Sequence, residues 1–219
     1  MTEAIEMSAL SLESLFKKGL KELSLPARSD QIKAFMTYLE ELKRWNRAYN
    51  LTSIRKDEDI IIKHFLDSLL YLRALPEGKI VVMDVGSGAG FPGIPLKIVR
   101  PEIRLFLVEP SRKKAGFLMH IIKTLRLQDV DVIEKRIEDV SGLEVDVALT
   151  RALFDVKDFY KKACHLLKED GRLILSKGPK LEEEIKNIKD EPQVKILKMR
   201  LPLTEIYRYI VIIHPTQQM

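Results

Sequence analysis

The first third of the chain has the spacing of apolar residues that is typical of amphipathic helices. Between residues 8 and 75, apolar side chains recur at intervals of three and four, which places them on one face of each helix. The pattern predicts three helices, with Pro26 between the first and the second and Ser29 as the N-cap of the second. The second helix is expected to end at Asn50 in a left-handed cap conformation, and the third to begin near Asp57.

From residue 79 onward, short apolar runs alternate with amphipathic segments, which predicts strands connected by helices. Seven strands are expected, over residues 81–85, 104–109, 130–134, 145–150, 172–176, 194–201 and 207–213. Asp170 and Gly171 are expected to form a turn, a helix is expected near 180–188, and the last two strands can pair antiparallel because their link is short. We therefore expect an α/β protein with a helical cap over residues 1–75 and a Rossmann-like domain over residues 76–219.

One stretch after the first predicted strand carries the clearest chemical signal. It contains, in order, Asp84, Gly86, Gly88, Gly90, Phe91 and Gly93. Glycines allow a backbone to approach a ligand closely, and the helix that follows begins with unpaired N–H groups. Counted from Gly86, the third glycine of a dinucleotide site would fall at Phe91, which is too large for tight helix–strand packing. The form D-x-G-x-G-x-G instead favours S-adenosylmethionine (AdoMet), whose ammonium Asp84 can serve directly or through water.

Other candidate residues follow the second, third and fourth predicted strands. They are Glu109, Ile137, Glu138 and Arg151. Ligands of open α/β sheets bind at the carboxyl ends of the strands, so we expect these residues to converge on the glycine loop. Glu109 follows the glycines at a separation of roughly 20 residues, where an acid accepts hydrogen bonds from a ribose diol. This separation fits NAD as well as AdoMet, so it indicates a nucleoside without choosing between them.

Residues 43–53 interleave basic, amide and aromatic side chains near the end of the second helix. Such a set can hold phosphates and can stack on or hydrogen-bond a base outside a duplex. The alternative is a core Trp and Tyr with solvated Lys and Arg between them, and spacing alone favours it. His64 and Asp67, three residues apart on the third helix, can face one another, although a lone His is more often structural. No His, Cys or carboxylate cluster has metal-ligand spacing, so no metal site is expected.

Composition narrows the possible partners and surroundings. Among 219 residues, 46% are hydrophobic and the net charge is +5, a modest excess that suits a polyanionic partner and equally suits a solvated basic surface. The single cysteine, Cys164, fits a reducing compartment. The acidic start of the chain lacks the layout of a signal peptide, and no apolar run has the length of a membrane span. We therefore expect a cytoplasmic protein that does not enter a membrane.

Together these segments resemble one known family over nearly the whole chain. The matching segments are 44–53, 64–68, 84–95, 150–152 and 177–178. The segments 44–53 and 84–95 are the most specific, since the family pattern also contains Pro92, Gly93 and Pro95. The chain is similar to the bacterial 16S ribosomal RNA methyltransferase G family, also called glucose-inhibited division protein B.

The resemblance implies AdoMet-dependent transfer of a methyl group to N7 of a guanosine in 16S rRNA near the decoding site. It also implies a Rossmann-like class I methyltransferase fold, with seven mostly parallel strands and a helical N-terminal cap. AdoMet contacts carry over to Gly86, Phe91, Ile137, Glu138 and Arg151. With the residues predicted from spacing, the expected cofactor site is Asp84, Gly86, Gly88, Phe91, Glu109, Ile137, Glu138 and Arg151.

The same resemblance, together with the basic segment, gives expectations for the RNA side of the site. RNA-binding residues are expected at Arg44, Asn46, Arg47, Tyr49 and Asn50. Arg151, Lys177 and Asn46 are expected to act in catalysis by position, with no general base. The expected partner is 16S rRNA or the small ribosomal subunit, and the chain is expected to be a monomer.

Three other functions compete with this one. A NAD-dependent oxidoreductase would use the same loop and Glu109, but the sequence offers no evident proton donor for it. A non-enzymatic RNA-binding module would use the basic cap, but it leaves the convergence at the sheet edge unexplained. An AdoMet enzyme with a small-molecule or protein acceptor is the third alternative, and the residues alone do not exclude it.

Overall fold

The computed structural model describes residues 2–151, 153–178 and 194–215. The helices are α1 (Thr2–Glu22), α2 (Ser29–Tyr49), α3 (Asp57–Ile60), α4 (Asp67–Leu69), α5 (Gly93–Val99), α6 (Arg112–Thr124) and α7 (Val156–Ala163). The strands are β1 (Val81–Val85), β2 (Arg104–Val108), β3 (Val130–Ile133), β4 (Val145–Arg151), β5 (Leu167–Lys177), β6 (Val194–Arg200) and β7 (Tyr207–Ile213). A π-helical turn, η1 (Ile61–Leu66), and three 3-10 turns, η2 (Leu70–Arg73), η3 (Ile137–Asp139) and η4 (Cys164–Leu166), complete the elements.

The three predicted helices of the cap are confirmed, with one correction at a terminus. Arg28, not Ser29, occupies the N-cap of α2, and no side chain caps the helix there; Ser29 is the first helical residue. Asn50 adopts the expected left-handed conformation, with φ 50° and ψ 54°, and its N–H donates to the Asn46 carbonyl. The third helix begins at Asp57 as predicted and continues without interruption through η1, α4 and η2.

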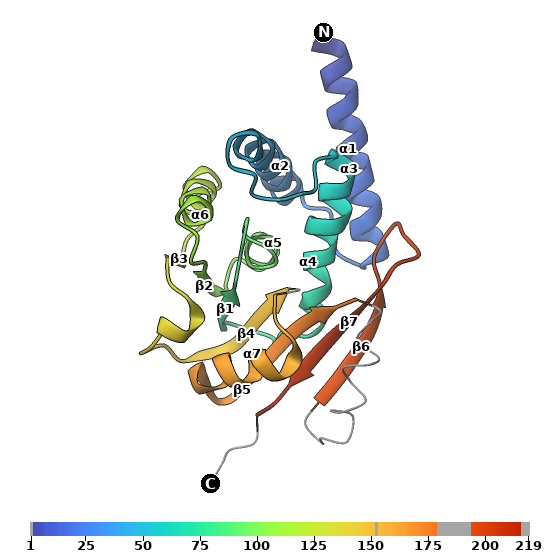
Figure 1. The fold of residues 1–219 in the computed structure, drawn as a ribbon. Coiled ribbons are helices and arrows are strands. Elements are labelled where there is room, and N and C mark those ends of the chain that lie inside the picture. Colours follow the sequence, from blue (N-terminus) through green and yellow to red (C-terminus); the bar gives the residue numbers. More distant parts are fainter. Residues whose placement is uncertain (1, 152, 179–193, 216–219) are drawn as a thin grey trace.

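The seven-stranded, mostly parallel sheet that was expected is confirmed. Its strand order is β3-β2-β1-β4-β5-β7-β6, and β7 runs antiparallel to both of its neighbours (Figure 1). The predicted turn at Asp170 and Gly171 is wrong, because both residues lie within β5. Val145 of β4 pairs with Leu167 of β5, and Val147 pairs with Arg172, so the extra residues of β5 form a bulge against β4. The helix expected near 180–188 lies outside the described residues.

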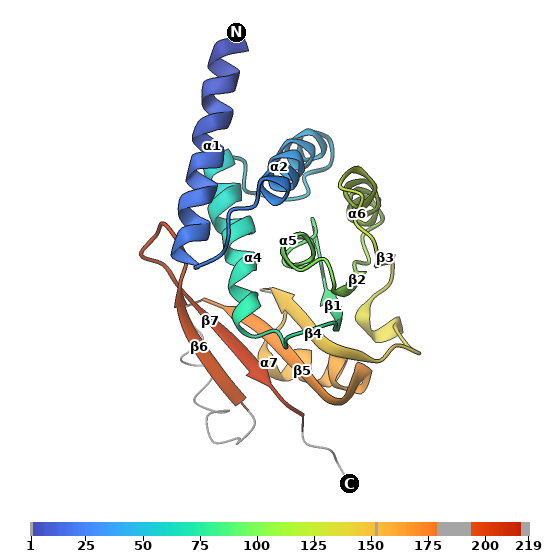
Figure 2. The same ribbon diagram turned by 180° about the vertical axis from the view of Figure 1, so that it is seen from behind.

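Side chains from both faces of the sheet are buried in two hydrophobic clusters. Alternate residues of β1 show this, since Val82 belongs to one cluster and Met83 to the other. Figures 1 and 2 show α5, α6 and the cap helices on one face and α7 on the other. The cluster on the cap side joins α1, α2 and the run from residue 57 to 73 to the sheet without a break. The cap therefore packs directly on the helix that follows the glycine loop.

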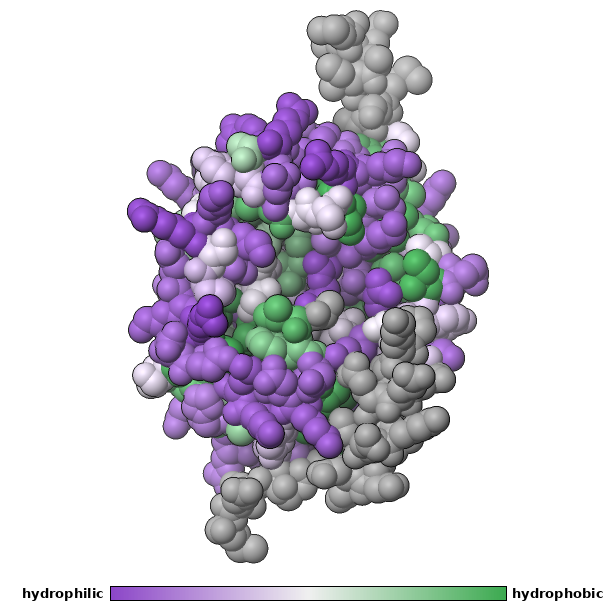
Figure 3. All heavy atoms as spheres, in the orientation of Figure 1, coloured by the Kyte–Doolittle hydropathy of each residue, from purple (hydrophilic) through white to green (hydrophobic). Residues whose placement is uncertain are grey.

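The outer surface is mostly hydrophilic, as expected for a chain with 32% charged residues. Figure 3 shows a limited hydrophobic area in the middle of the face seen in Figure 1, with hydrophilic side chains around it. Within the described residues, no helix combines the length and apolar character that a membrane span requires.

Candidate functional site

The glycine loop after β1 requires glycine for conformation as well as for space. Gly86, Gly88 and Gly90 all have positive φ, at 70°, 60° and 95°. A Cβ atom on Gly90 would lie 2.6 Å from the Tyr38 hydroxyl, which donates a hydrogen bond to the Ala89 carbonyl. The cap helix α2 therefore fixes the loop from behind.

Asp84 lies beneath this loop with no exposed area. Its Oδ2 accepts a hydrogen bond of 2.8 Å from the N–H of Gly93, at the start of α5, while its Oδ1 is buried and has no partner. Burial raises the pKa of Asp84 to about 7, against the opposing effects of the Gly93 bond and the Arg151 charge. The carboxyl group thus connects β1 to the start of α5, and its Oδ1 remains an unpartnered acceptor below the glycine loop.

Glu109 follows β2 and binds the loop from the side. Its Oε2 accepts from the N–H of Gly88 at 2.8 Å, and its Oε1 accepts from the N–H of Ser111 at 3.0 Å. A carboxylate has about four lone-pair positions, so two backbone bonds leave capacity for ligand hydroxyls. Glu109 is therefore brought to the glycine loop, as its position in the sequence predicts.

Phe91 lies at the centre of a stack that links the loop to the cap. Its ring is parallel to that of His64, with centroids 4.4 Å apart, and it also stacks on Tyr38 at 5.3 Å. The Arg151 guanidinium lies over the same ring, 5.2 Å from its centroid. Because Phe91 is only 4% exposed, it acts here as a packing residue that holds His64 and Arg151 in place.

Arg151, at the carboxyl end of β4, is the centre of a polar network. Its Nη2 bonds His64 Nδ1 at 2.9 Å, and its Nη1 donates to the Lys63 carbonyl at 3.1 Å and lies 3.6 Å from Asp67 Oδ2. Asp67 Oδ1 accepts a bond of 2.8 Å from Arg208 Nε on β7. Burial raises the pKa of Asp67, and the two guanidinium groups oppose that rise. The Arg151 side chain is thus held by three cap residues, one of which, Asp67, is bonded in turn to the last strand.

His64 is neutral in this network, and its tautomer follows from its partners. Burial, followed by the nearby Arg151 charge, lowers the pKa of His64 to about 3. Arginine can only donate, so Nδ1 accepts from Arg151 and Nε2–H donates to Thr52 Oγ1 at 2.9 Å. Both ring nitrogens are therefore occupied within the protein.

The remaining predicted residues at this edge lie farther out. Lys177, at the end of β5, donates to the Phe154 carbonyl in the segment after β4. Ile137 is buried, whereas Glu138 is exposed and pairs with Lys162 of α7. That hydrogen bond lowers the pKa of Glu138. Of the expected cofactor residues, Asp84, Phe91, Glu109 and Arg151 are thus joined to the glycine loop by the contacts above, whereas Ile137 and Glu138 contact the other face of the sheet and α7.

The expected RNA-binding residues all lie at the C-terminal end of α2 or directly after it, but their contacts differ. Arg44 contacts Glu41 and, at 3.3 Å, His120 of α6, while Tyr49 packs on Trp45. Arg47 and Asn46 line a small hollow beside α2, and Asn50 accepts from Arg55 at 3.4 Å. Asn46 is buried, and its Oδ1 accepts from the N–H of Thr52 at 2.9 Å. A role of these residues in RNA binding stays a prediction.

Sequence reasoning left His64 and Asp67 undecided and missed Tyr38 and Arg208. The spacing of His64 and Asp67 placed them on one helical face, but nothing in the sequence connects either residue to β7. Tyr38 belongs to the apolar face of α2, where its hydroxyl gives no separate signal. Across the described residues, no group of three or more His, Cys, Asp and Glu side chains is arranged to hold a metal ion.

Known proteins similar to this chain agree with this geometry. The ribosomal protein L11 methylase from Lactobacillus delbrueckii subsp. bulgaricus has a TM-score of 0.56 at 16% identity, covering 74% of this chain and 81% of that one. That likeness shows the class I methyltransferase fold. Ribosomal RNA small subunit methyltransferase G from Neisseria meningitidis serogroup B is 35% identical over 90% of this chain and 95% of its own length.

The protein of the same name from Caldanaerobacter subterraneus subsp. tengcongensis is also 35% identical, over 94% of this chain and 91% of its own length. A family model described as rRNA small subunit methyltransferase G, or GidB, matches residues 31–205. The chain therefore belongs to the rRNA small subunit methyltransferase G family.

Proposed function

We propose that this protein transfers a methyl group from AdoMet to N7 of a guanosine in 16S rRNA, near the decoding site. The observation that carries the proposal is the packing of Arg151 and His64 on Phe91 of the glycine loop, in a chain of this family. This contact holds the Arg151 guanidinium at the edge of the sheet where AdoMet, the methyl donor of the family, is expected to bind. The relatives carry small-subunit rRNA in their names, which supports the choice of substrate.

The residues at this edge fit AdoMet. Gly86 and Gly88 both have positive φ, and a Cβ on Gly88 would meet nothing closer than 3.9 Å, which leaves room for a ligand there. A Cβ on Gly86 would instead lie 2.2 Å from Leu153 Cδ2, so the Leu153 side chain packs against this part of the loop. Glu109 keeps free lone pairs for a ribose diol, and Ile137 and Glu138 would face the adenine. The unpartnered Oδ1 of Asp84 is a buried acceptor under the expected position of the ammonium.

Methyl transfer to guanine N7 requires alignment of the two substrates rather than a proton transfer by the protein. Bound AdoMet supplies a methyl group on a sulfonium, which is already an activated leaving group. Guanine N7 carries a free lone pair at neutral pH, so the protein has no proton to remove there. The structure supports this division of roles, because His64 is neutral and both of its nitrogens are bonded within the protein. We assign Arg151 and Lys177 to positioning at the mouth of the site, with catalysis resting on alignment and exclusion of water.

The test is methyl transfer from labelled AdoMet to small subunits that lack the modification and to naked 16S rRNA. Chemical cleavage at N7-methylguanosine then locates the modified position. One cleavage site near the decoding region supports the proposal in full. Transfer without such cleavage refutes the N7 assignment, and the absence of transfer to either RNA form refutes the substrate.

The same proposal extends to partners and location. The protein would act as a monomer in the cytoplasm, with no metal ion, on rRNA or on the small subunit. Sedimentation of the purified protein tests the oligomeric state, and activity that survives a chelator tests the absence of a metal.

A further inference from the structure

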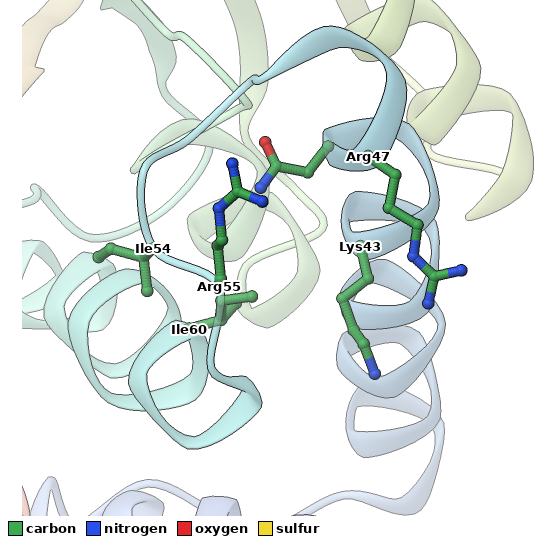
Figure 4. Close-up of a pocket in the computed structure, with 6 residues that line it drawn as sticks. Lys43, Arg47, Ile54, Arg55 and Ile60 are labelled. Carbon is green, nitrogen blue, oxygen red and sulfur yellow. The ribbon is translucent and has the colours of Figure 1, made fainter.

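A small hollow lies between the end of α2 and the segment that leads into α3. Its volume is about 200 Å³, and it is lined by Lys43, Asn46, Arg47, Ile54, Arg55 and Ile60 (Figure 4). Pockets for drug-sized ligands measure roughly 300–1,000 Å³, so this one suits a smaller group. Figure 4 shows Lys43 and Arg47 on one wall, and Ile54 and Arg55 on the other.

The charges around this hollow are mostly positive and only partly neutralised. Lys43 pairs with Asp57 at 2.7 Å and with Glu40 at 3.5 Å. The Arg47 side chain has no ion pair or hydrogen bond to any residue in the described part of the chain. Arg55 donates only a long bond of 3.4 Å to the neutral Asn50. Two guanidinium groups therefore remain available, and planar guanidinium donors match phosphate oxygens well.

The hollow is also connected to the polar network around Arg151. Asn46 in its wall accepts from the N–H of Thr52, Thr52 accepts from His64, and His64 accepts from Arg151, each at 2.9 Å. The Thr52 hydroxyl also accepts from the N–H of Ile54, which lines the hollow, at 3.2 Å. One chain of bonds thus fixes the hollow relative to the sheet edge.

We propose that this hollow binds a backbone phosphate of single-stranded RNA, with Arg47 and Arg55 as its ligands and Lys43 in support. The inference rests on the proposed function and adds a subsite to it. Its role is to set the position of the strand that carries the target guanosine. The apolar side chains of Ile54 and Ile60 suit the sugar next to that phosphate. Arg44 and Tyr49 do not line the hollow and lie outside this subsite.

The test compares the double variant Arg47→Ala/Arg55→Ala with Arg28→Ala/Lys33→Ala. Arg28 and Lys33 are exposed at the other end of α2 and do not line the hollow, so their double variant is a control for the loss of two positive charges. Each protein is assayed with labelled AdoMet on the RNA form that the wild type methylates. AdoMet affinity and thermal melting are measured alongside, to show that the variants are folded.

The Arg47→Ala/Arg55→Ala variant is expected to raise KM for the RNA tenfold or more, with kcat and AdoMet affinity nearly unchanged, because a phosphate contact acts equally before and during methyl transfer. The slope of log K against log salt for RNA binding should fall by about 0.7, the value for one phosphate on a single strand. Arg28→Ala/Lys33→Ala should change neither quantity.

Two results would overturn the subsite. One is an Arg47→Ala/Arg55→Ala variant whose KM and salt slope match those of Arg28→Ala/Lys33→Ala, and the other is a loss confined to kcat. A wild-type chain that methylates neither RNA form is a different failure, since it removes the proposed function itself and with it the basis of the subsite.

Discussion

The neutral state of His64 predicts an acid sensitivity of the folded state. The imidazole is 7% exposed, and it accepts from a guanidinium that repels its protonated form. His64→Gln removes the titrating group and keeps both an acceptor and a donor for Arg151 and Thr52. Comparing the two proteins therefore separates the effect of protonation from the loss of a side chain.

The magnitude follows from the pKa of His64, which is 6.5 when unperturbed and about 3 in the fold. A pKa that is lowered by folding stabilises the native state above the unfolded value and loses that contribution as the pH falls below it. At pH 5, roughly 1.5 pH units below the pKa of His64 in the unfolded chain, His64 lowers the unfolding free energy by about 2 kcal/mol relative to pH 7.5.

Asp84 has the opposite effect in the same range. Its pKa is raised from 3.8 to about 7, so its protonated form favours the folded state as the pH falls. At pH 5 this contribution is also about 2 kcal/mol, which offsets the effect of His64 in the wild type. Only the difference between wild type and His64→Gln isolates the imidazole, because Asp84 is present in both.

The assay is urea unfolding followed by circular dichroism at pH 7.5 and pH 5, at constant ionic strength. The unfolding free energy of the wild type relative to His64→Gln should fall by about 2 kcal/mol between the two pH values. His165→Gln, at an exposed histidine, should follow the wild type. An equal change of the unfolding free energy in wild type and His64→Gln between the two pH values would refute the buried neutral imidazole.

Two further changes test the edge of the sheet. Arg151→Ala should lower the unfolding free energy by about 2–4 kcal/mol, because Asp67 and His64 each lose a charged donor, and should reduce methyl transfer at least tenfold. Urea unfolding and turnover measure these effects, and a variant close to wild type in both would contradict the network. Glu109→Gln should weaken AdoMet binding about tenfold, because an amide replaces the pair of carboxylate acceptors next to Gly88. A tenfold loss corresponds to one hydrogen bond to a charged group. Equilibrium dialysis with labelled AdoMet checks this, and unchanged affinity would exclude Glu109 from the ribose site.

The sequence pattern was most informative where local physics decides the structure. Glycines at every second position after an apolar run predicted the loop, because glycine adopts the positive φ values found there without strain. Asn50 was predicted as a left-handed cap because Asn adopts that conformation more readily than most residues with a side chain. Asp170 and Gly171 were wrongly predicted as a turn, because a bulge in a long strand uses the same residue types as a turn.

The candidate site was harder to predict where long-range contacts decide it. In the segment 43–53, Lys43, Asn46, Arg47 and Asn50 have the spacing i, i+3, i+4 and i+7 of a single helical face. That spacing could have added Lys43, which lines the same hollow as Asn46 and Arg47, to the predicted RNA-binding residues. No spacing leads to Arg208, because its contact with Asp67 depends on how the sheet is ordered.

The contact between Arg208 and Asp67 has a consequence for biosynthesis. It joins residues 141 positions apart, and β7 is inserted between two strands that are already separated in the sequence. A ribosome that is still translating this chain has released the glycine loop and the cap long before it adds Arg208. Until then Asp67 lacks one of its two guanidinium partners. The network that holds Arg151 is therefore complete only after β7 has been synthesised and has joined the sheet.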